Sequence, residues 1–322
     1  MSLQTFSAPS RQRLSDYVAL ARPDHWFKNV FMLPGVALAL VLRAEPLSLS
    51  LVRDLVIAFV ATCLIASANY TINEWLDADF DRHHPVKRLR PSALGHVSMG
   101  LVGLQWFLLA AAGLALASVL GILFMRVAAV LLCMGIVYNV QPLRTKDRHY
   151  LDVLSESINN PLRFMLGWAA VVSTTLPPSS ILLAYWMGGA FLMAVKRYAE
   201  FRFIGNPTTA ALYRRSFRSY TEETLLLSSF FYALTAAFFL GVFLIKYRIE
   251  FLLSIPLFAL LFVWYLHIGM KADSVTQKPE RLYQEPAFLA YVVFLGLVVT
   301  ALFFIHIPWL SILVTDHVLT GG

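Results

Sequence analysis

Residues 55–81 read LVIAFVATCLIASANYTINEWLDADFD, an apolar run that ends directly in an acidic segment. A helix needs about 20 mostly apolar residues to cross a bilayer, so the run predicts a membrane-spanning helix. Acidic side chains are costly in or near the hydrocarbon layer and mark functional positions when they occur there. The stretch therefore indicates an α-helical membrane fold, and its acidic end is a candidate functional site.

Eight further apolar runs lie along the 322-residue chain. They account for a composition with 58% hydrophobic and only 14% charged residues, where soluble domains have about 25% charged residues. We expect one all-α, polytopic membrane domain over residues 1–322, with nine transmembrane helices. The nine predicted spans cover residues 27–42, 55–72, 101–119, 122–140, 154–172, 181–195, 224–245, 252–268 and 287–308.

The basic residues are distributed unequally between the two sides of the membrane. Residues 1–25 are polar and lack the apolar core of a cleavable signal peptide. If nine spans follow, 21 of the 26 Lys and Arg residues share the side of the N-terminus. Basic residues concentrate on the cytoplasmic side, so we expect a cytoplasmic N-terminal segment on a multi-pass protein of the plasma (inner) membrane. The net charge of +7 then belongs largely to one membrane face, which argues against nucleic acid as a partner.

The strongest candidate site closes the second span, where Asn73, Asp77 and Asp81 recur at intervals of four residues. On a helix this spacing places them on one face, about 6 Å apart along the axis. Two carboxylates and an amide oxygen suit Mg²⁺, which commonly shares its coordination with substrate phosphates. We interpret these three residues as the metal site and as the catalytic residues. The simpler alternative is a solvated helix end.

Basic residues follow this segment at Lys87, Arg88 and Arg90. Cations beside a metal–carboxylate cluster are suited to holding a phosphate or pyrophosphate. A basic run at the end of a span is also typical of a membrane anchor, so this alternative stays open.

A second, weaker acidic pair, Asp152 and Glu156, opens the fifth span. These carboxylates are further candidates for metal binding, and the alternative is a helix N-terminus that favours acids through its dipole. Residues 159–161, Asn-Asn-Pro, should kink this span, because proline lacks the N–H that a continuous helix requires.

These motifs together resemble the UbiA-type membrane prenyltransferases, and within them the branch of the decaprenyl-phosphate phosphoribosyltransferases. The resemblance implies a nine-helix bundle with its active site on the cytoplasmic side. The fifth span departs from the branch at residues 159–161 and Trp168, although Arg163 and Gly167 match it. The matching motifs are, in chain order, Arg22-Pro23-Asp24-His25-Trp26-Phe27-Lys28-Asn29, Asn73 to Asp81, His84 to Pro91, Lys196-Arg197-Tyr198-Ala199-Glu200 and Ser219-Tyr220-Thr221.

The activity that the resemblance implies is a transfer reaction of cell-wall biosynthesis. The 5-phosphoribosyl group of phosphoribosyl pyrophosphate (PRPP) moves to a polyprenyl phosphate, and pyrophosphate is released, with Mg²⁺ as the cofactor. The acceptor phosphate is already ionised at neutral pH, so no general base is required. The residues expected to hold the phosphates or the ribose of the donor are Lys28, Lys87, Arg88, Arg90, Lys146, Arg163, Lys196, Arg197, Tyr198 and Glu200.

Two alternatives remain open. A conventional prenyltransferase would bind a polyprenyl pyrophosphate at the same metal and pass the prenyl group to an aromatic or other acceptor. A non-enzymatic transporter would place acids near the bilayer midplane, whereas these acidic clusters lie at helix ends. The cations Lys28, Lys196 and Arg197 favour a highly phosphorylated, polar donor, and so the phosphoribosyl reaction. The lipid chain length and the oligomeric state stay open.

Overall fold

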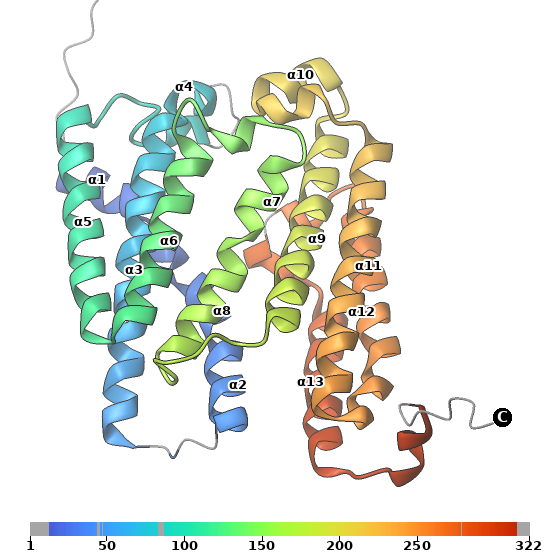
Figure 1. Cartoon of the computed structure of the whole chain (residues 1–322). Helices are drawn as coiled ribbons and strands as arrows, with labels where there is room; N and C mark the ends of the chain where they lie inside the picture. Colours follow the sequence, from blue (N-terminus) through green and yellow to red (C-terminus); the bar gives the residue numbers. More distant parts are fainter. Residues whose placement is uncertain (1–12, 44–45, 47, 83–86, 278, 314–322) are drawn as a thin grey trace, which may run out of the picture. The chain divides into compact units, whose positions relative to one another are not determined.

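The computed structural model describes residues 13–313 apart from 44, 45, 47, 83–86 and 278, and this part of the chain is α-helical with short 3₁₀ segments (Figure 1). Eight helical stretches in it are long and apolar enough to cross a membrane. This confirms the all-α, multi-pass membrane fold, with eight such stretches where nine spans were predicted. They are Leu14–Arg43, Leu49–Leu76, Met99–Val119, Ile122–Asn139, Ser179–Ile204, Glu222–Tyr247, Ile249–Gly269 and Pro286–Phe304.

The chain divides into two compact units, each described by itself. The first comprises Met1–Pro177 and Asn206–Tyr220, and the second Pro178–Gly205 and Thr221–Gly322. The expectation of a single membrane domain stays a prediction.

The first unit is built around α3, which packs along α5 and α6, while α8 packs against α2 and α6 (Figure 1). Ile65, Phe124, Leu131 and Leu166 lie in its buried core. Its elements are α1 (Leu14–Ala21), η1 (Pro23–Met32), α2 (Leu33–Arg43), α3 (Leu49–Leu76), α4 (Ala78–Asp81), η2 (Lys87–Leu89), α5 (Met99–Val119), α6 (Ile122–Asn139), η3 (Thr145–Asp147), α7 (Leu151–Ser157), α8 (Asn159–Ala169), α10 (Pro207–Tyr213) and η4 (Arg215–Arg218).

The second unit pairs α9 with α11 and α12 with α13. Buried Glu250, which precedes α12, is bonded to the segment that follows α13, because its Oε1 atom accepts the Ile307 N–H at 3.1 Å and lies 2.8 Å from His306 Nδ1. The elements are α9 (Ser179–Ile204), α11 (Glu222–Tyr247), η5 (Ile249–Ser254), α12 (Ile255–Gly269), η6 (Val275–Gln277), η7 (Pro279–Gln284), α13 (Pro286–Phe304) and η8 (Pro308–Leu313).

The first predicted span, residues 27–42, opens in a 3₁₀ segment rather than in an α-helix. Arg22 ends α1 with a left-handed backbone (φ 51°), and Pro23 then begins η1. The Trp26 indole N–H donates to Ser67 Oγ at 2.9 Å. This bond holds η1 against α3.

The predicted fifth span, residues 154–172, is broken into α7 and α8, and this explains the difference between nine and eight. Pro161 has no N–H to donate to the carbonyl of Ser157, the last residue of α7. At the same break, the Asn159 side chain donates to a neighbouring carbonyl, that of Glu156, at 3.0 Å. The predicted kink is therefore confirmed, and neither piece reaches the length of a spanning helix.

Two glycines let α8 approach η1 and α2 backbone to backbone. A Cβ atom on Gly167 would lie 2.0 Å from the Met32 carbonyl oxygen, and one on Gly35 would lie 2.0 Å from the Phe164 carbonyl oxygen. Small residues allow such close packing between membrane helices. Each of these positions therefore requires glycine, because the backbone of the facing segment occupies the space that a Cβ atom would need.

We expect Gly167→Ala to destabilise the protein by about 1–3 kcal/mol, because the methyl group forces two backbones apart. The measurement is the midpoint of thermal unfolding in detergent. Gly103→Ala in α5 is the matched control, since no atom lies within 4 Å of its added Cβ and alanine favours a helix over glycine. A Gly167→Ala midpoint equal to that of the control would contradict the close contact.

Candidate active site

The acidic segment keeps a helical register across the junction of α3 and α4. The Asp77 N–H donates to the Asn73 carbonyl at 3.0 Å, and the Asp81 N–H donates to the Asp77 carbonyl at 2.8 Å. Asn73, Asp77 and Asp81 thus follow one another at the four-residue interval of a helix, as their spacing predicts. Asp79 departs from this row, since its side chain is 85% exposed and lies 3.2 Å from Arg82.

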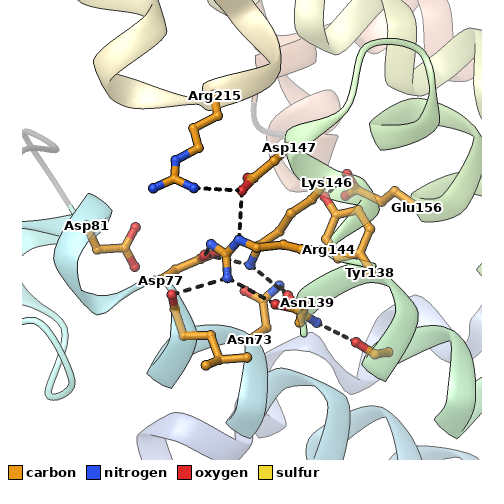
Figure 2. Close-up of polar contacts among 12 residues, drawn as sticks. Asn73, Asp77, Asp81, Tyr138, Asn139, Arg144, Lys146, Asp147, Glu156 and Arg215 are labelled. Carbon is orange, nitrogen blue, oxygen red and sulfur yellow. Dashed lines mark hydrogen bonds and ion pairs between the residues drawn. The ribbon is translucent and has the colours of Figure 1, made fainter. Parts of the chain in front are cut away.

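Asp77 is the centre of a buried ion-pair network (Figure 2). Its Oδ1 atom accepts from Arg144 Nη2 at 3.0 Å and from Lys146 Nζ at 2.5 Å. The side chains of Arg144 and Lys146 are only 8% and 6% exposed. Charges this deeply buried require compensation, so the carboxylate of Asp77 fixes two cations at the end of α3.

Asn139, the last residue of α6, connects the parts of this network. Its Oδ1 atom accepts from Asn73 Nδ2 and from Lys146 Nζ, both at 2.7 Å. Its carbonyl oxygen accepts from Arg144 Nη1 at 3.0 Å. Asn139 was not among the residues predicted from the sequence, where its signal was an amide at the end of an apolar span.

Two further charges extend the network toward η4. Arg144 Nε donates to Asp147 Oδ2 at 2.9 Å, and Arg215 Nη1 lies 3.4 Å from the same oxygen (Figure 2). The Arg215 guanidinium also lies 4.8 Å from the centre of the Phe80 ring. We call Arg144, Lys146 and Arg215 the Asp77 basic cluster. Of the three, only Lys146 was among the predicted site residues.

Burial lowers the pKa of Lys146 to about 8, because desolvation disfavours the ammonium and Arg144 adds to that effect, while the attraction of Asp77 opposes it. Since pH 7 lies below this value, most molecules keep the charge. The cluster therefore presents three cations at neutral pH.

Asp81 and Glu74 share a different cation, Arg90. Arg90 Nη1 lies 2.6 Å from Asp81 Oδ2, and Arg90 Nε lies 3.9 Å from Glu74 Oε2. Glu74 also accepts from Ser92 Oγ at 3.3 Å. Arg90 was predicted to hold phosphate, and the structure places it beside the predicted metal ligand Asp81.

The predicted metal ligands are not assembled into a ready-made cage. Within the described residues, no group of three or more His, Cys, Asp or Glu side chains is arranged to hold a metal ion. Asn73, Asp77 and Asp81 instead contact Asn139, Lys146 and Arg90, respectively. Their donor type still fits Mg²⁺, which is usually held by one or two carboxylates together with waters and substrate phosphates.

Asp152, a predicted candidate metal ligand, lies among hydroxyl groups in the structure, and metal binding by this residue stays a prediction. Its side chain is fully buried and accepts from Ser216 Oγ at 3.1 Å and from Tyr220 Oη at 2.8 Å. These hydroxyl bonds connect α7 to the η4 region. The other member of the pair, Glu156, accepts from Tyr138 Oη at 3.0 Å.

We expect Tyr220→Phe to lower the free energy of unfolding by about 1–3 kcal/mol, because it removes a donor to buried Asp152 and the acceptor of the Tyr150 N–H. Chemical or thermal unfolding in detergent measures the change. Tyr283→Phe, at a tyrosine that is 66% exposed, should leave the stability unchanged. Equal stability of the two variants would exclude Tyr220 as the anchor of this connection.

The other predicted phosphate ligands are distributed among several places. Arg163 Nε donates to Asn29 Oδ1 at 2.9 Å, which joins α8 to η1. Lys28 lies on η1 beside His25. Arg88 is exposed, and the side chain of Lys87 lies outside the described part of the chain.

Four predicted residues, Lys196, Arg197, Tyr198 and Glu200, lie on α9 in the second unit. Arg197 is fully buried and lies 3.4 Å from Glu200 Oε2. Tyr198 Oη accepts from Arg202 Nη1 at 3.1 Å. In the first unit, the structure brings together Asn73, Asp77 and Lys146 in one network, and Asp81 and Arg90 in another.

Comparison with known proteins places the chain among related sequences and folds. The model of the UbiA prenyltransferase family matches residues 31–292. The chain is 31% identical over 226 residues to the decaprenyl-phosphate phosphoribosyltransferase of Mycolicibacterium smegmatis. This alignment covers 69% of this chain and 68% of that protein. It is 32% identical over 226 residues to the protein of the same name from Mycobacterium tuberculosis. This alignment covers 70% of this chain and 72% of that protein.

A solved structure shares the fold. A UbiA homolog from Archaeoglobus fulgidus, bound to GPP and Mg²⁺, matches with a TM-score of 0.66 at 21% sequence identity, over 89% of this chain and 98% of that chain. The agreement extends over nearly the whole of the solved chain.

Proposed function

The chain belongs to the UbiA prenyltransferase family of membrane transferases, and from this premise we propose that it transfers the 5-phosphoribosyl group of PRPP to a polyprenyl phosphate. The bond from the anomeric carbon to the pyrophosphate oxygen breaks, and a bond from that carbon to an oxygen of the lipid phosphate forms. Pyrophosphate leaves with the bonding electrons. The relatives named for this activity, at 31% and 32% identity, support the proposal.

The observation that carries the proposal is the Asp77 basic cluster. A pyrophosphate leaving group gains negative charge as its bond to carbon breaks, and fixed cations stabilise that charge most effectively where water is excluded. Arg144 and Lys146 are almost fully buried and are held in place by Asp77 and Asn139. They would neutralise the leaving group without having to reorganise.

Asp77 and Asp81, with Asn73, would hold a divalent metal, for which we propose Mg²⁺. When bound, such an ion neutralises phosphate charge and orients the leaving group. The charges of the two carboxylates are compensated by Lys146 and Arg90. When a metal ion with its bound substrate phosphate enters, the carboxylates can bind the metal and the two cations can bind the phosphate. The attacking phosphate oxygen is ionised at neutral pH, so no residue needs to remove a proton.

The lipid acceptor and the cellular location follow from the same proposal. The apolar surface of the membrane helices suits a polyprenyl chain. The unequal distribution of Lys and Arg between the two sides of the membrane supports a cytoplasmic N-terminus and insertion in the inner membrane. A water-soluble donor such as PRPP would then be taken from the cytoplasm.

The test is incubation of the purified protein with Mg²⁺, polyprenyl phosphate and PRPP labelled in the ribose. We expect the label to enter the lipid fraction and pyrophosphate to appear in equal amount. If PRPP is inert and label from a prenyl pyrophosphate enters an aromatic acceptor, the protein is a conventional prenyltransferase. Omission of the metal by chelation should stop either reaction.

A further inference from the structure

The side chain of Asn139, at the end of α6, is an amide whose two ends are both fixed. The residue is only 2% exposed. Its Nδ2 atom donates to the Gly135 carbonyl at 2.8 Å, and its Oδ1 atom accepts from Lys146 Nζ at 2.7 Å. A carbonyl oxygen only accepts and an ammonium only donates. The two partners therefore allow a single orientation of this amide, with its oxygen toward Lys146.

The orientation of Asn139 determines the orientation of Asn73 on the facing helix α3. Asn73 Nδ2 donates to the same Asn139 Oδ1 atom at 2.7 Å (Figure 2). Because that oxygen can only accept, Asn73 presents its NH2 group to Asn139 and turns its own oxygen away. Among the contacts of the described residues, Asn73 Oδ1 accepts no hydrogen bond. An amide oxygen suits Mg²⁺, whereas an NH2 group only donates hydrogen bonds.

The register of α6 against α3 brings these two amides together. One turn before Asn73, the Asn69 side chain donates to the Leu131 carbonyl of α6 at 2.9 Å. A Cβ atom on Gly135 would lie 2.0 Å from Asn69 Oδ1, so a larger residue there would push the two helices apart. The contacting residues repeat every four positions on both helices, which keeps them on one face of each. Side-chain hydrogen bonds thus join the two faces at two successive turns.

We propose that Asn139 is a positioning residue for the metal site: it fixes the amide of Asn73 so that the carbonyl oxygen, and not the NH2 group, is available to a divalent cation. The inference rests on the metal site of the proposed function. Asn73, Asp77 and Asp81 would hold the cation, and Asn139 would act only through Asn73. Partners that orient metal ligands in this way typically contribute about 10- to 100-fold to the metal affinity.

The experiment measures Mn²⁺ binding to the full-length, substrate-free protein in detergent by electron paramagnetic resonance. Four proteins form a double-mutant cycle: the wild type, Asn139→Leu, Asn73→Ala and the variant with both substitutions. We expect Asn139→Leu alone to weaken Mn²⁺ binding about tenfold or more, because the Asn73 amide can then rotate. In the Asn73→Ala background no amide is left to orient, so the same substitution should weaken binding by less than about threefold.

Asn69→Leu is the matched control. It also removes a side-chain hydrogen bond between α3 and α6, one turn before Asn73, and it should leave the Mn²⁺ affinity unchanged. Unfolding midpoints show whether each variant is folded, and Asn139→Ala replaces Asn139→Leu if leucine beside the buried Lys146 prevents folding. The proposal is overturned if Asn139→Leu weakens Mn²⁺ binding equally in both backgrounds or not at all, or if Asn69→Leu causes the same loss.

The outcome does not depend on turnover. If Mn²⁺ binding shows the coupling between Asn139 and Asn73 while PRPP gives no labelled lipid, the positioning role stands and the proposed reaction fails. If labelled lipid forms while the two substitutions act independently on Mn²⁺ binding, the reaction stands and the positioning role is refuted. A wild-type protein that binds no Mn²⁺ without substrate also overturns the positioning role.

Discussion

Asp77→Asn is expected to lower the rate of phosphoribosyl transfer by about 10²–10³-fold, the usual effect of removing one fixed electrostatic contact from an active site. The substitution removes the negative charge that would hold a metal and that orients Arg144 and Lys146. Asparagine keeps an oxygen at the same place, so both cations retain an acceptor and the fold should persist. Initial rates over a range of Mg²⁺ concentrations, with the unfolding midpoint measured in parallel, test the prediction.

Asp79→Asn provides the control for this experiment. It makes the same chemical change two residues away, on a side chain that is 85% exposed, and it should leave the rate close to that of the wild type. An Asp77→Asn protein with normal turnover would remove Asp77 from the active site. Equal losses in both variants would indicate a general effect of charge on this segment.

Lys146→Gln is expected to change two measurements in opposite directions. Turnover should fall by about 10²-fold, because the leaving pyrophosphate loses a buried cation. The affinity of the substrate-free protein for a divalent metal should rise, because the ammonium at 2.5 Å from Asp77 Oδ1 no longer competes for that carboxylate. Steady-state kinetics measures the turnover rate. Titration with Mn²⁺, monitored by electron paramagnetic resonance, measures the metal affinity.

Lys246→Gln, at an exposed lysine near the end of α11, should change neither quantity. If Lys146→Gln weakens metal binding, the lysine supports the metal site rather than competing with it. A mutant with normal turnover would show that the Asp77 basic cluster does not hold the leaving group.

The two networks at the end of α3 also explain how acidic residues can lie at the end of a membrane helix. Every acid there that was expected to bind a metal has a cation within ion-pair distance: Arg144 and Lys146 for Asp77, and Arg90 for Asp81. Such pairing makes it less costly to place charges at the membrane boundary. It also leaves cations in place for an anionic substrate.

Features that depend on residues close together in the chain can be predicted from the sequence. Long apolar runs are sufficient to recognise spanning helices, since the bilayer sets their length. The four-residue spacing of Asn73, Asp77 and Asp81 placed them in one helical register, because helix geometry is local. The break of the fifth span likewise follows from Pro161, whose ring acts on the residues immediately before it.

Which of these residues contact one another depends on the folded chain. Asp77 is 67 residues from Arg144 and 69 from Lys146 in sequence, and the packing of α3 against α6 brings them together. The same spacing rule that identified Asp77 also suggested Asp152, yet the latter turns inward to hydroxyls more than 60 residues away. A spacing pattern shows which face a side chain occupies, but the neighbour across that face belongs to another segment, and only the folded chain identifies it.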